Sequence, residues 1–301
     1  MDAFTHSIDL KSRADVLHIY AIGDVHIGAQ NFDLERFQKY IKIIKNDKNA
    51  KVVFLLGDIL DLVVMSDQKR FTVTNFDDES LTGEPKVIRK NLSNLAVKQV
   101  QRAIKMLSPI KDCIIGAVKG NHEEAVEKSC KIDCHQMLCE ELGVRDCGDV
   151  GFAVIKISRN GVGSRAIKVA FMHYASGGRT AGAGNNSLAR AMNIFSSDIV
   201  FQGHNHSPAV QRIVRIGCTQ NNKNTRAGDD GEPRIVHLEQ LGINIGSFLY
   251  SYKQNTNGYD QAKLFNPKEC TLYRVVAKLH ETHLQDQRSS TPKFIYRVEE
   301  L

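Results

Sequence analysis

The chain has 301 residues, of which 42% are hydrophobic and 25% charged, and its formal net charge is +6. A chain of this length can bury a core of its own, which excludes a disordered protein and a small scaffold that depends on disulfides. The seven cysteines lack small-scaffold spacing and indicate a reducing compartment. We expect a cytoplasmic protein with no signal peptide, no transmembrane segment and no membrane partner. The mild positive charge permits anionic substrates but does not by itself indicate nucleic acid.

The first predicted element is a buried strand over residues 16–22, which ends at Gly23 and is followed by Asp24 and His26. Side chains two positions apart in an extended chain point the same way, so this carboxylate and imidazole can face one point. Together they would make half of a divalent-metal site. The alternative is an aspartate that caps a helix beside a histidine of the core, and this pair alone does not decide between them.

Helices and strands alternate through the middle of the chain. The spacing of apolar residues predicts helices over 33–45, 91–107, 124–142 and 188–195, and strands over 51–56, 113–118, 152–157, 166–173 and 198–202. Residues 63–90 are polar and poorly periodic, and we interpret them as a long excursion over the active-site face. The glycine-rich residues 177–186 are predicted to form a loop.

Short alternating runs separated by turns follow residue 209 and predict a mostly antiparallel sheet. These runs cover residues 210–216, 234–238, 243–250, 272–279 and 294–298. Neither an internal repeat nor a low-complexity linker is evident. We therefore expect residues 1–301 to form a single domain, with its motifs at about 16–208 and the antiparallel strands at about 209–301.

The helix predicted over 124–142 and its flank are rich in cysteine and histidine: Cys130, Cys134, His135, Cys139 and Cys147. Cys130 and Cys134 would lie one helical turn apart and could begin a structural zinc site. The alternative is that these cysteines pack as small hydrophobic side chains, which is the commoner use of a free cysteine on a helix face.

Polar residues follow the predicted strands in a repeated pattern. Four strands end at a glycine that is followed at once by Asp, His or Asn, namely at Gly23, Gly57, Gly120 and Gly203, and a fifth strand ends at His173. Glycine permits a sharp turn and a close approach of backbones, so several such ends can crowd one spot. Carboxylate, amide and imidazole groups together suit Mn, Fe or Zn. The pattern therefore predicts a metal site.

As an ordered set, these motifs resemble those of the calcineurin-like metallophosphoesterases, from about residue 17 to residue 208. The matching motifs are Asp24-x-His26, Gly57-Asp58-x-x-Asp61, Gly120-Asn121-His122-Glu123, His173 and Gly203-His204-x-His206. The resemblance implies an α/β fold in which two β-sheets pack as a sandwich flanked by helices, in four layers. It also implies two divalent metal ions, with Mn as the first choice and Fe, Zn, Ni or Co as alternatives.

The resemblance assigns roles to individual residues. It places one ion on Asp24, His26, Asp58 and His206, and the other on Asp58, Asn121, His173 and His204, so that Asp58 bridges both. His122 would bind neither ion and would give a proton or positive charge to the leaving group, unless it merely packs beside the site. Asp61 is expected to act by orienting a ligand or closing its turn rather than by binding metal. Glu123 would cap the following helix or orient His122.

The branch of the family is indicated by smaller features. Leu62 and Val63 follow Asp61, where phosphoprotein phosphatases carry Arg-Gly. The opening motifs resemble the nuclease and phosphodiesterase branch, although those nucleases often carry Asp where this chain has Glu123. The loop at 176–183 resembles one in small phage-type metallophosphoesterases. We hypothesise that its Arg179 binds the substrate phosphate, and the alternative is a solvated arginine.

Together these features predict a phosphodiesterase or nuclease-like phosphoester hydrolase that uses a metal-bridging hydroxide, with nucleic acid among the candidate substrates. One alternative is a phosphomonoesterase (phosphatase) that acts on small molecules or phosphoprotein. A more remote alternative is a non-catalytic scaffold of the same fold, although this chain keeps all seven ligand positions and His122. The oligomeric partner, if any, is not indicated.

Overall fold

The computed structural model describes residues 1–12, 14–62, 76, 82–86, 94–173, 182–218, 235–250, 252, 271–279 and 294–301. The strands are β1 (Asp2–Leu10), β2 (Leu17–Ile22), β3 (Ala50–Leu55), β4 (Ile114–Ala117), β5 (Val150–Arg159), β6 (Val162–Met172), β7 (Ile199–Gln202), β8 (Ala209–Cys218), β9 (Ile235–Asn244), β10 (Tyr273–Leu279) and β11 (Phe294–Glu300). The helices are α1 (Leu34–Asn46), α4 (Leu95–Leu107), α5 (Asn121–Cys130), α6 (Cys134–Leu142), α7 (Ala183–Ile194) and the 3-10 helix η2 (Ser108–Cys113).

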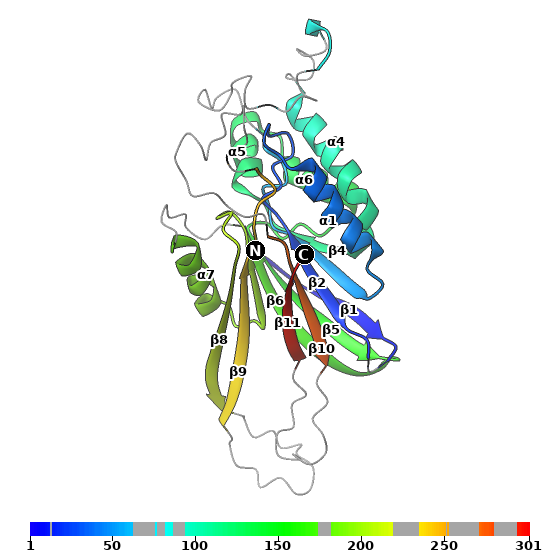
Figure 1. Ribbon diagram of the computed structural model, residues 1–301, viewed down its shortest axis with the longest axis vertical. Coiled ribbons are helices and arrows are strands. Elements are labelled where there is room, and N and C mark those ends of the chain that lie inside the picture. Colours follow the sequence, from blue (N-terminus) through cyan, green and yellow to red (C-terminus); the bar gives the residue numbers. More distant parts are fainter. Residues whose placement is uncertain are drawn as a thin grey trace, which may run out of the picture.

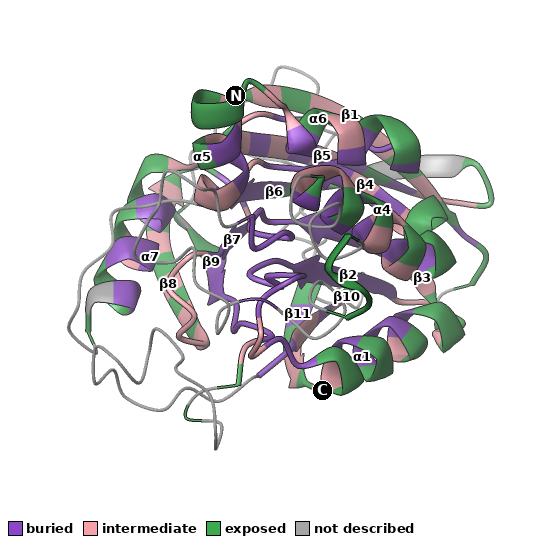
Figure 2. Cartoon of the chain, turned by 90° about the horizontal axis from the view of Figure 1, so that it is seen from above, coloured by how far each residue is buried: buried purple, intermediate pink, exposed green. Residues whose placement is uncertain are grey.

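Two mixed sheets pack face to face. The described strands form a six-stranded sheet in the order β1-β5-β6-β7-β9-β8 and a five-stranded sheet in the order β11-β10-β2-β3-β4. A buried cluster between them joins side chains of β2 and β3, such as Ile19 and Phe54, to those of β6 and β7, such as Phe171 and Phe201. Figure 2 shows this interior as buried strands and loops enclosed by helices.

Helices cover both outer faces of the sandwich. The core cluster on the outer face of the five-stranded sheet includes side chains of α1, α4 and α6, and α7 packs on the six-stranded sheet through Leu188 and Met192. In Figure 1, α7 accordingly lies on the opposite flank from α1 and α4. The four-layer α/β fold implied by the sequence resemblance is therefore confirmed.

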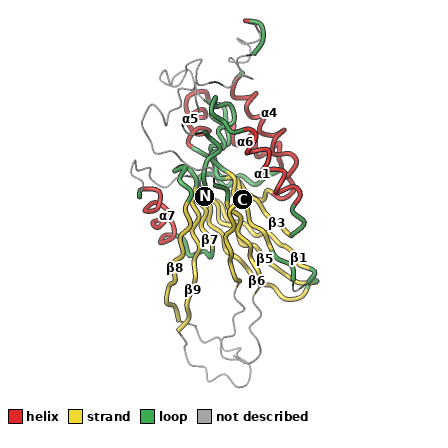
Figure 3. Tube along the Cα trace, in the orientation of Figure 1, coloured by secondary structure: helices red, strands yellow, loops and turns green. Residues whose placement is uncertain are grey.

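The sheets bring the motif-bearing strand ends together. β2, β3 and β4 are mutually parallel, as are β6, β7 and β9, and carboxyl ends of parallel strands meet at one edge of a sheet. The loops that leave these ends gather between the strands and the helices (Figure 3). Open α/β sheets place their ligands at this edge.

Two sequence-based predictions about helices are wrong. The helix predicted over 124–142 is two helices, because Lys131 adopts a left-handed φ of 57° that ends α5 and the Asp133 side chain accepts a hydrogen bond from Gln136 N at the start of α6. Cys130 and Cys134 consequently lie on different helices. The loop predicted over 177–186 is also too long, since α7 already begins at Ala183.

Among the described strands, β1 has no counterpart in the sequence-based prediction. It pairs in parallel with β5 at the edge of the six-stranded sheet, and its residues alternate between partial burial and exposure up to Leu10. An edge strand buries little, so its sequence stays polar. The C-terminal strands do form antiparallel pairs, β8 with β9 and β10 with β11. They extend the two sheets instead of forming one of their own. The strand predicted over 243–250 is wrong, because β9 already ends at Asn244.

A polar network ties the C-terminal strands to the core at the opposite end of β2. Asp47, which follows α1, accepts hydrogen bonds at 2.5 Å from the Tyr20 hydroxyl and lies 2.5 Å from His18 Nδ1. Arg274 of β10 donates to the same Tyr20 hydroxyl at 3.3 Å and pairs with Glu299 of β11. The network therefore connects α1, β2, β10 and β11.

We expect Asp47→Asn to lower the free energy of unfolding at pH 7 by about 1–3 kcal/mol, because it removes the charge that these donors stabilise. Burial raises the pKa of Asp47, but the hydrogen bonds from Tyr20 and His18 outweigh it and lower the pKa from 3.8 to about 2. The ionised group thus stabilises the fold above about pH 4 and ceases to do so as the pH falls toward 2. Urea unfolding should therefore show that the difference in free energy of unfolding between wild type and Asp47→Asn shrinks over that pH range.

The exposed Asp112 of η2 offers the control, since Asp112→Asn should leave stability within about 0.5 kcal/mol of wild type. If the free energy of unfolding of Asp47→Asn stayed below that of wild type by the same amount from pH 7 to pH 2, the result would contradict the proposed charge effect.

Candidate metal centre

Strained backbone turns place the side chains that follow the strands. Asp24, His26 and Asp58 all have left-handed φ values, of 49°, 54° and 46°, a conformation that non-glycine residues adopt at a cost of about 1–3 kcal/mol. Backbone hydrogen bonds between the two loops hold them there: Asp24 N donates to Gly57 O and His26 N donates to Asp58 O, each at 3.0 Å. The loops after β2 and β3 therefore support each other.

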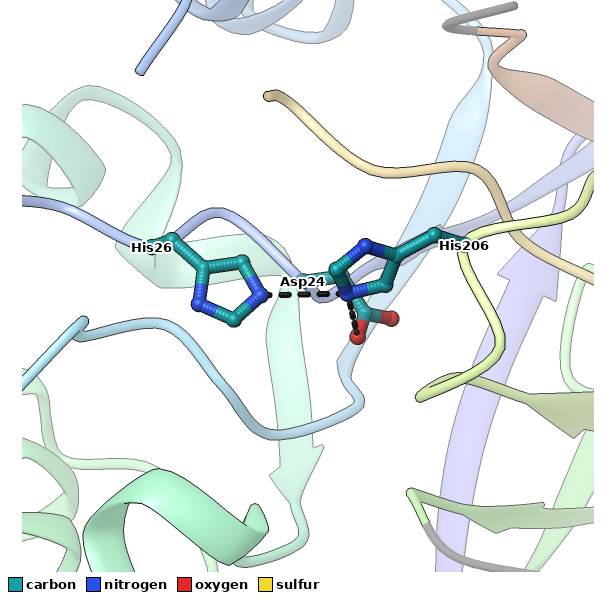
Figure 4. A group of neighbouring side chains, drawn as sticks. All are labelled: Asp24, His26 and His206. Carbon is teal, nitrogen blue, oxygen red and sulfur yellow. Dashed lines mark hydrogen bonds and ion pairs between the residues drawn. The ribbon is translucent and has the colours of Figure 1, made fainter. Parts of the chain in front are cut away.

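One group of donor atoms consists of Asp24, His26 and His206. His206 Nε2 lies 3.1 Å from Asp24 Oδ1 and 3.1 Å from His26 Nε2, as Figure 4 shows. Asp24 and His26 are buried and His206 is partly buried. The three side chains come from the loops after β2 and β7, in opposite sheets, so the group spans the sandwich.

A second group consists of Asp58, His173 and His204. His173 Nε2 lies 3.2 Å from Asp58 Oδ2, and its Nδ1 lies 2.7 Å from Leu56 O. Asn121 joins the group through its Oδ1 atom, which lies 3.0 Å from His173 Nε2 and 2.8 Å from His204 Nδ1. The structure thus brings all seven predicted ligand residues into two adjoining groups.

His122 lies at the junction of these groups. It forms a third group with His26 and Asp58, and its Nε2 is 3.8 Å from Asp58 Oδ2. Its Nδ1 faces the backbone carbonyl oxygen of Asp61 at 2.5 Å. The Asp61 carboxylate lies 3.5 Å from His26 Nδ1 and 3.6 Å from His122 Nδ1. Asp61 therefore contacts the far sides of two rings and is in none of the three groups.

The arrangement fits divalent cations. His26 Nε2 and His206 Nε2 face each other at 3.1 Å, a spacing at which two imidazoles need a shared proton or a cation between them. Ligand atoms at about 2.0–2.1 Å from one ion are themselves about 3 Å apart. The Nδ1 atoms of His26, His122 and His173 face oxygen atoms, which is how protein ligands leave Nε2 free for a metal.

The charges in the cluster also favour a cation. Burial raises the pKa of Asp58, but the nearby His122 and His173 outweigh it and hold that pKa well below its usual value. Burial lowers the pKa of His173, yet the charge of Asp58 and their hydrogen bond raise it to about 10. The buried carboxylates thus keep positive charge beside them, and a divalent ion would supply it in place of a proton.

Glu123 joins two of the motif loops. Its buried carboxylate accepts hydrogen bonds from Asp58 N at 3.0 Å, from Leu60 N at 3.0 Å and from Gly120 N at 3.1 Å. The bond to Gly120 is the helix cap that we expected, and the bonds to the Asp58 loop were missed. Gly120 has to be glycine here, because a Cβ atom would lie 2.1 Å from Asp58 N.

Several other predictions fall outside this cluster. Arg179 and most of the 63–90 excursion lie outside the described residues; Phe76, which is described, is buried and forms a β-bridge with Ala29. Within the described residues no cysteine belongs to a metal-binding group. Burial raises the pKa of the Cys134 thiol to about 12, so this thiol packs as an uncharged side chain. None of the described helices is both long and apolar enough to span a membrane.

The solved structures that the chain matches are distant in sequence. Vps29 from Entamoeba histolytica, solved with Zn²⁺, is 13% identical with a TM-score of 0.35, over 94% of this chain and 98% of that one. A predicted phosphoesterase from Streptococcus pneumoniae is 11% identical with a TM-score of 0.33, over 94% and 97%. A metallophosphoesterase from Sphaerobacter thermophilus is 13% identical with a TM-score of 0.32, over 86% and 82%.

No curated protein sequence matches the chain. The family model described as calcineurin-like phosphoesterase matches residues 17–208, a span that includes every strand end of the cluster and most of the chain. The family is one of metal-dependent phosphoesterases, in agreement with the grouping of carboxylate and imidazole ligands. The chain therefore belongs to the calcineurin-like phosphoesterase family.

Proposed function

We propose that the protein is a dinuclear phosphoester hydrolase that prefers phosphodiesters, with nucleic acid among its candidate substrates. The observation that supports this most is the convergence of donor atoms from five distant segments into overlapping groups, two of which share Asp58. Two divalent cations, with Mn²⁺ as our first choice, would activate water at neutral pH and neutralise charge on the phosphate. A cytoplasmic location remains our prediction from the sequence.

The seven side chains divide between two ions. We assign one ion to Asp24, His26 and His206 and the other to Asn121, His173 and His204, with Asp58 shared by both. A shared carboxylate reduces the repulsion between two cations. The neutral oxygen of Asn121 adds no charge to its site, which leaves that ion a strong Lewis acid.

His122 would assist the leaving group. Its Nδ1 faces the Asp61 carbonyl oxygen, so Nδ1 carries a hydrogen and Nε2 is the atom available toward the cluster. A protonated ring would donate a hydrogen to the departing alkoxide, which is a general acid's task. We give Asp61 a positioning role, because its carboxylate lies against the Nδ1 atoms of His26 and His122. Arg179 remains our candidate for binding the phosphate.

A substrate panel tests the proposal. Protein stripped of metal and reloaded with Mn²⁺ would be assayed on bis(4-nitrophenyl) phosphate, 4-nitrophenyl phosphate, cyclic nucleotides, and single- and double-stranded DNA, with an EDTA-treated sample as the control. We expect metal-dependent hydrolysis with higher kcat/KM on the diester. Faster turnover of the monoester would contradict the proposed phosphodiesterase activity and indicate a phosphatase instead. If the protein hydrolysed none of these esters, the result would contradict catalysis and favour the non-catalytic scaffold.

A further inference from the structure

We infer that residues 244–248, which lie beyond the 17–208 family match, form a buttress segment that sets the geometry of the metal centre, with Asn244 as its main positioning residue. The inference rests on the proposed metal site. It concerns residues for which the sequence motifs give no role. Residues 241–248 are all buried, although β9, which ends at Asn244, exposes Ile235 and residues 237–239 near its start.

The buttress segment holds the loop that carries His204 and His206 at both ends. At the end of this loop, the fully buried Asn244 donates from Nδ2 to Ser207 O at 2.6 Å. At its start, Ile245 N donates to Gln202 O at 2.9 Å. Both metal ligands lie between these two bonds, so the path of their loop is fixed from the side of β9.

The same segment holds the loop that carries Asp24 and His26. Phe248 N donates to Asp24 O at 3.0 Å. The side chain of Ile245 packs so close to Gly23 that a Cβ atom there would lie 2.9 Å from Ile245 Cδ1. Since Gly23 follows β2 of the five-stranded sheet and Asn244 ends β9 of the six-stranded sheet, the segment joins the two sheets at the ligand-bearing edge.

These bonds matter because the first group of ligands straddles the two sheets. The 3.1 Å separation between His206 Nε2 and Asp24 Oδ1 joins the two loops, and both residues have left-handed φ values, of 51° and 49°. Such backbone persists only where its surroundings enforce it. Loss of a partner that orients a metal ligand typically lowers metal affinity about 10–100-fold.

Gln240 provides a matched control for Asn244. It is also a buried amide of β9, and it also donates to a loop carbonyl, that of Phe195, at 2.7 Å. Phe195 follows α7 and precedes β7, so this bond is at the opposite end of β7 from the metal ligands. Gln240→Ala therefore removes a comparable buried hydrogen bond from the same strand, together with a longer one that Gln240 Oε1 accepts from Arg215 at 3.3 Å, without touching a ligand loop.

The experiment is a calorimetric titration of metal-free wild type, Asn244→Ala and Gln240→Ala with Mn²⁺, alongside thermal unfolding of each. We expect one of the two Mn²⁺ ions to bind Asn244→Ala at least about tenfold more weakly. Gln240→Ala should bind both ions as wild type does, even if its melting temperature falls as far as that of Asn244→Ala. Electron paramagnetic resonance of bound Mn²⁺ should show loss of the spin-coupled pair in Asn244→Ala alone.

The inference would be overturned if Asn244→Ala bound both ions with wild-type affinity. It would also be overturned if Gln240→Ala lost as much Mn²⁺ affinity as Asn244→Ala does. The wild-type titration separates this failure from that of the proposed function. If wild type binds no Mn²⁺, the metal site itself is wrong. If wild type binds two ions and Asn244→Ala binds them equally well, the positioning role alone is wrong.

Discussion

Asp58→Asn should lower phosphoester hydrolysis by about 10²–10³-fold or more and weaken the binding of both ions. Asparagine keeps the shape of the side chain and an acceptor for His122 N, which Asp58 Oδ1 binds at 2.9 Å. The substitution therefore removes the negative charge while the fold is retained. Asp58 shares one group with His173 and His204 and another with His26, which we assign to the other ion, so the loss should affect both ions rather than one.

Asp198→Asn is the matched control. Asp198 precedes β7 at the end opposite to the ligands, and its carboxylate accepts a hydrogen bond from Lys168 N at 2.7 Å, which asparagine can also accept. Metal content by mass spectrometry and kcat/KM on bis(4-nitrophenyl) phosphate should match wild type in this control. If Asp58→Asn itself retained two ions and full activity, Asp58 could not be the bridging ligand.

His122→Gln should lower kcat by about 10²–10⁴-fold on an ester with an alkyl leaving group. The loss on a 4-nitrophenyl ester should be much smaller, because 4-nitrophenolate leaves without a proton. Metal affinity should change little, since we assign His122 to neither ion. Comparing kcat for a methyl and a 4-nitrophenyl ester of the same phosphate measures this difference directly.

His135→Gln is the companion control, because His135 is a buried histidine of α6 whose Nε2 lies 3.0 Å from Asp146 Oδ1 and which belongs to none of the metal-binding groups among the described residues. It should leave the ratio of the two rates unchanged. An equal loss on both esters in His122→Gln would remove the general-acid role. Loss of one bound ion in His122→Gln would instead indicate that His122 is a metal ligand. Its place beside His26 and Asp58 would allow that role.

The sequence could predict the part of the site that depends on residues adjacent in the chain. A buried strand, a glycine and a polar residue are adjacent in the chain, as at Gly57 and Asp58, and parallel pairing then brings such strand ends together. The amphipathic helix at 33–45 was equally readable: its apolar face buries Phe37 and Tyr40, and Asp33 caps its first turn.

Features that depend on distant pairing could not be predicted in this way. Asn244 supports a ligand loop only because β9 pairs with β7 and places it beside Ser207, and nothing in the residues around it signals that contact. The three backbone donors of Glu123 likewise come from two loops about sixty residues apart in sequence. The break at Lys131 went unpredicted because lysine gives no local signal for a left-handed turn.

Anomalous diffraction from crystals grown with Mn²⁺ would test the dinuclear site most directly. We expect two peaks, one among Asp24, His26 and His206 and one among Asp58, His173 and His204, each within about 2.0–2.3 Å of its ligand atoms. A map with no peak beside the Asp58 carboxylate, at Mn²⁺ concentrations that saturate the titration, would contradict the account.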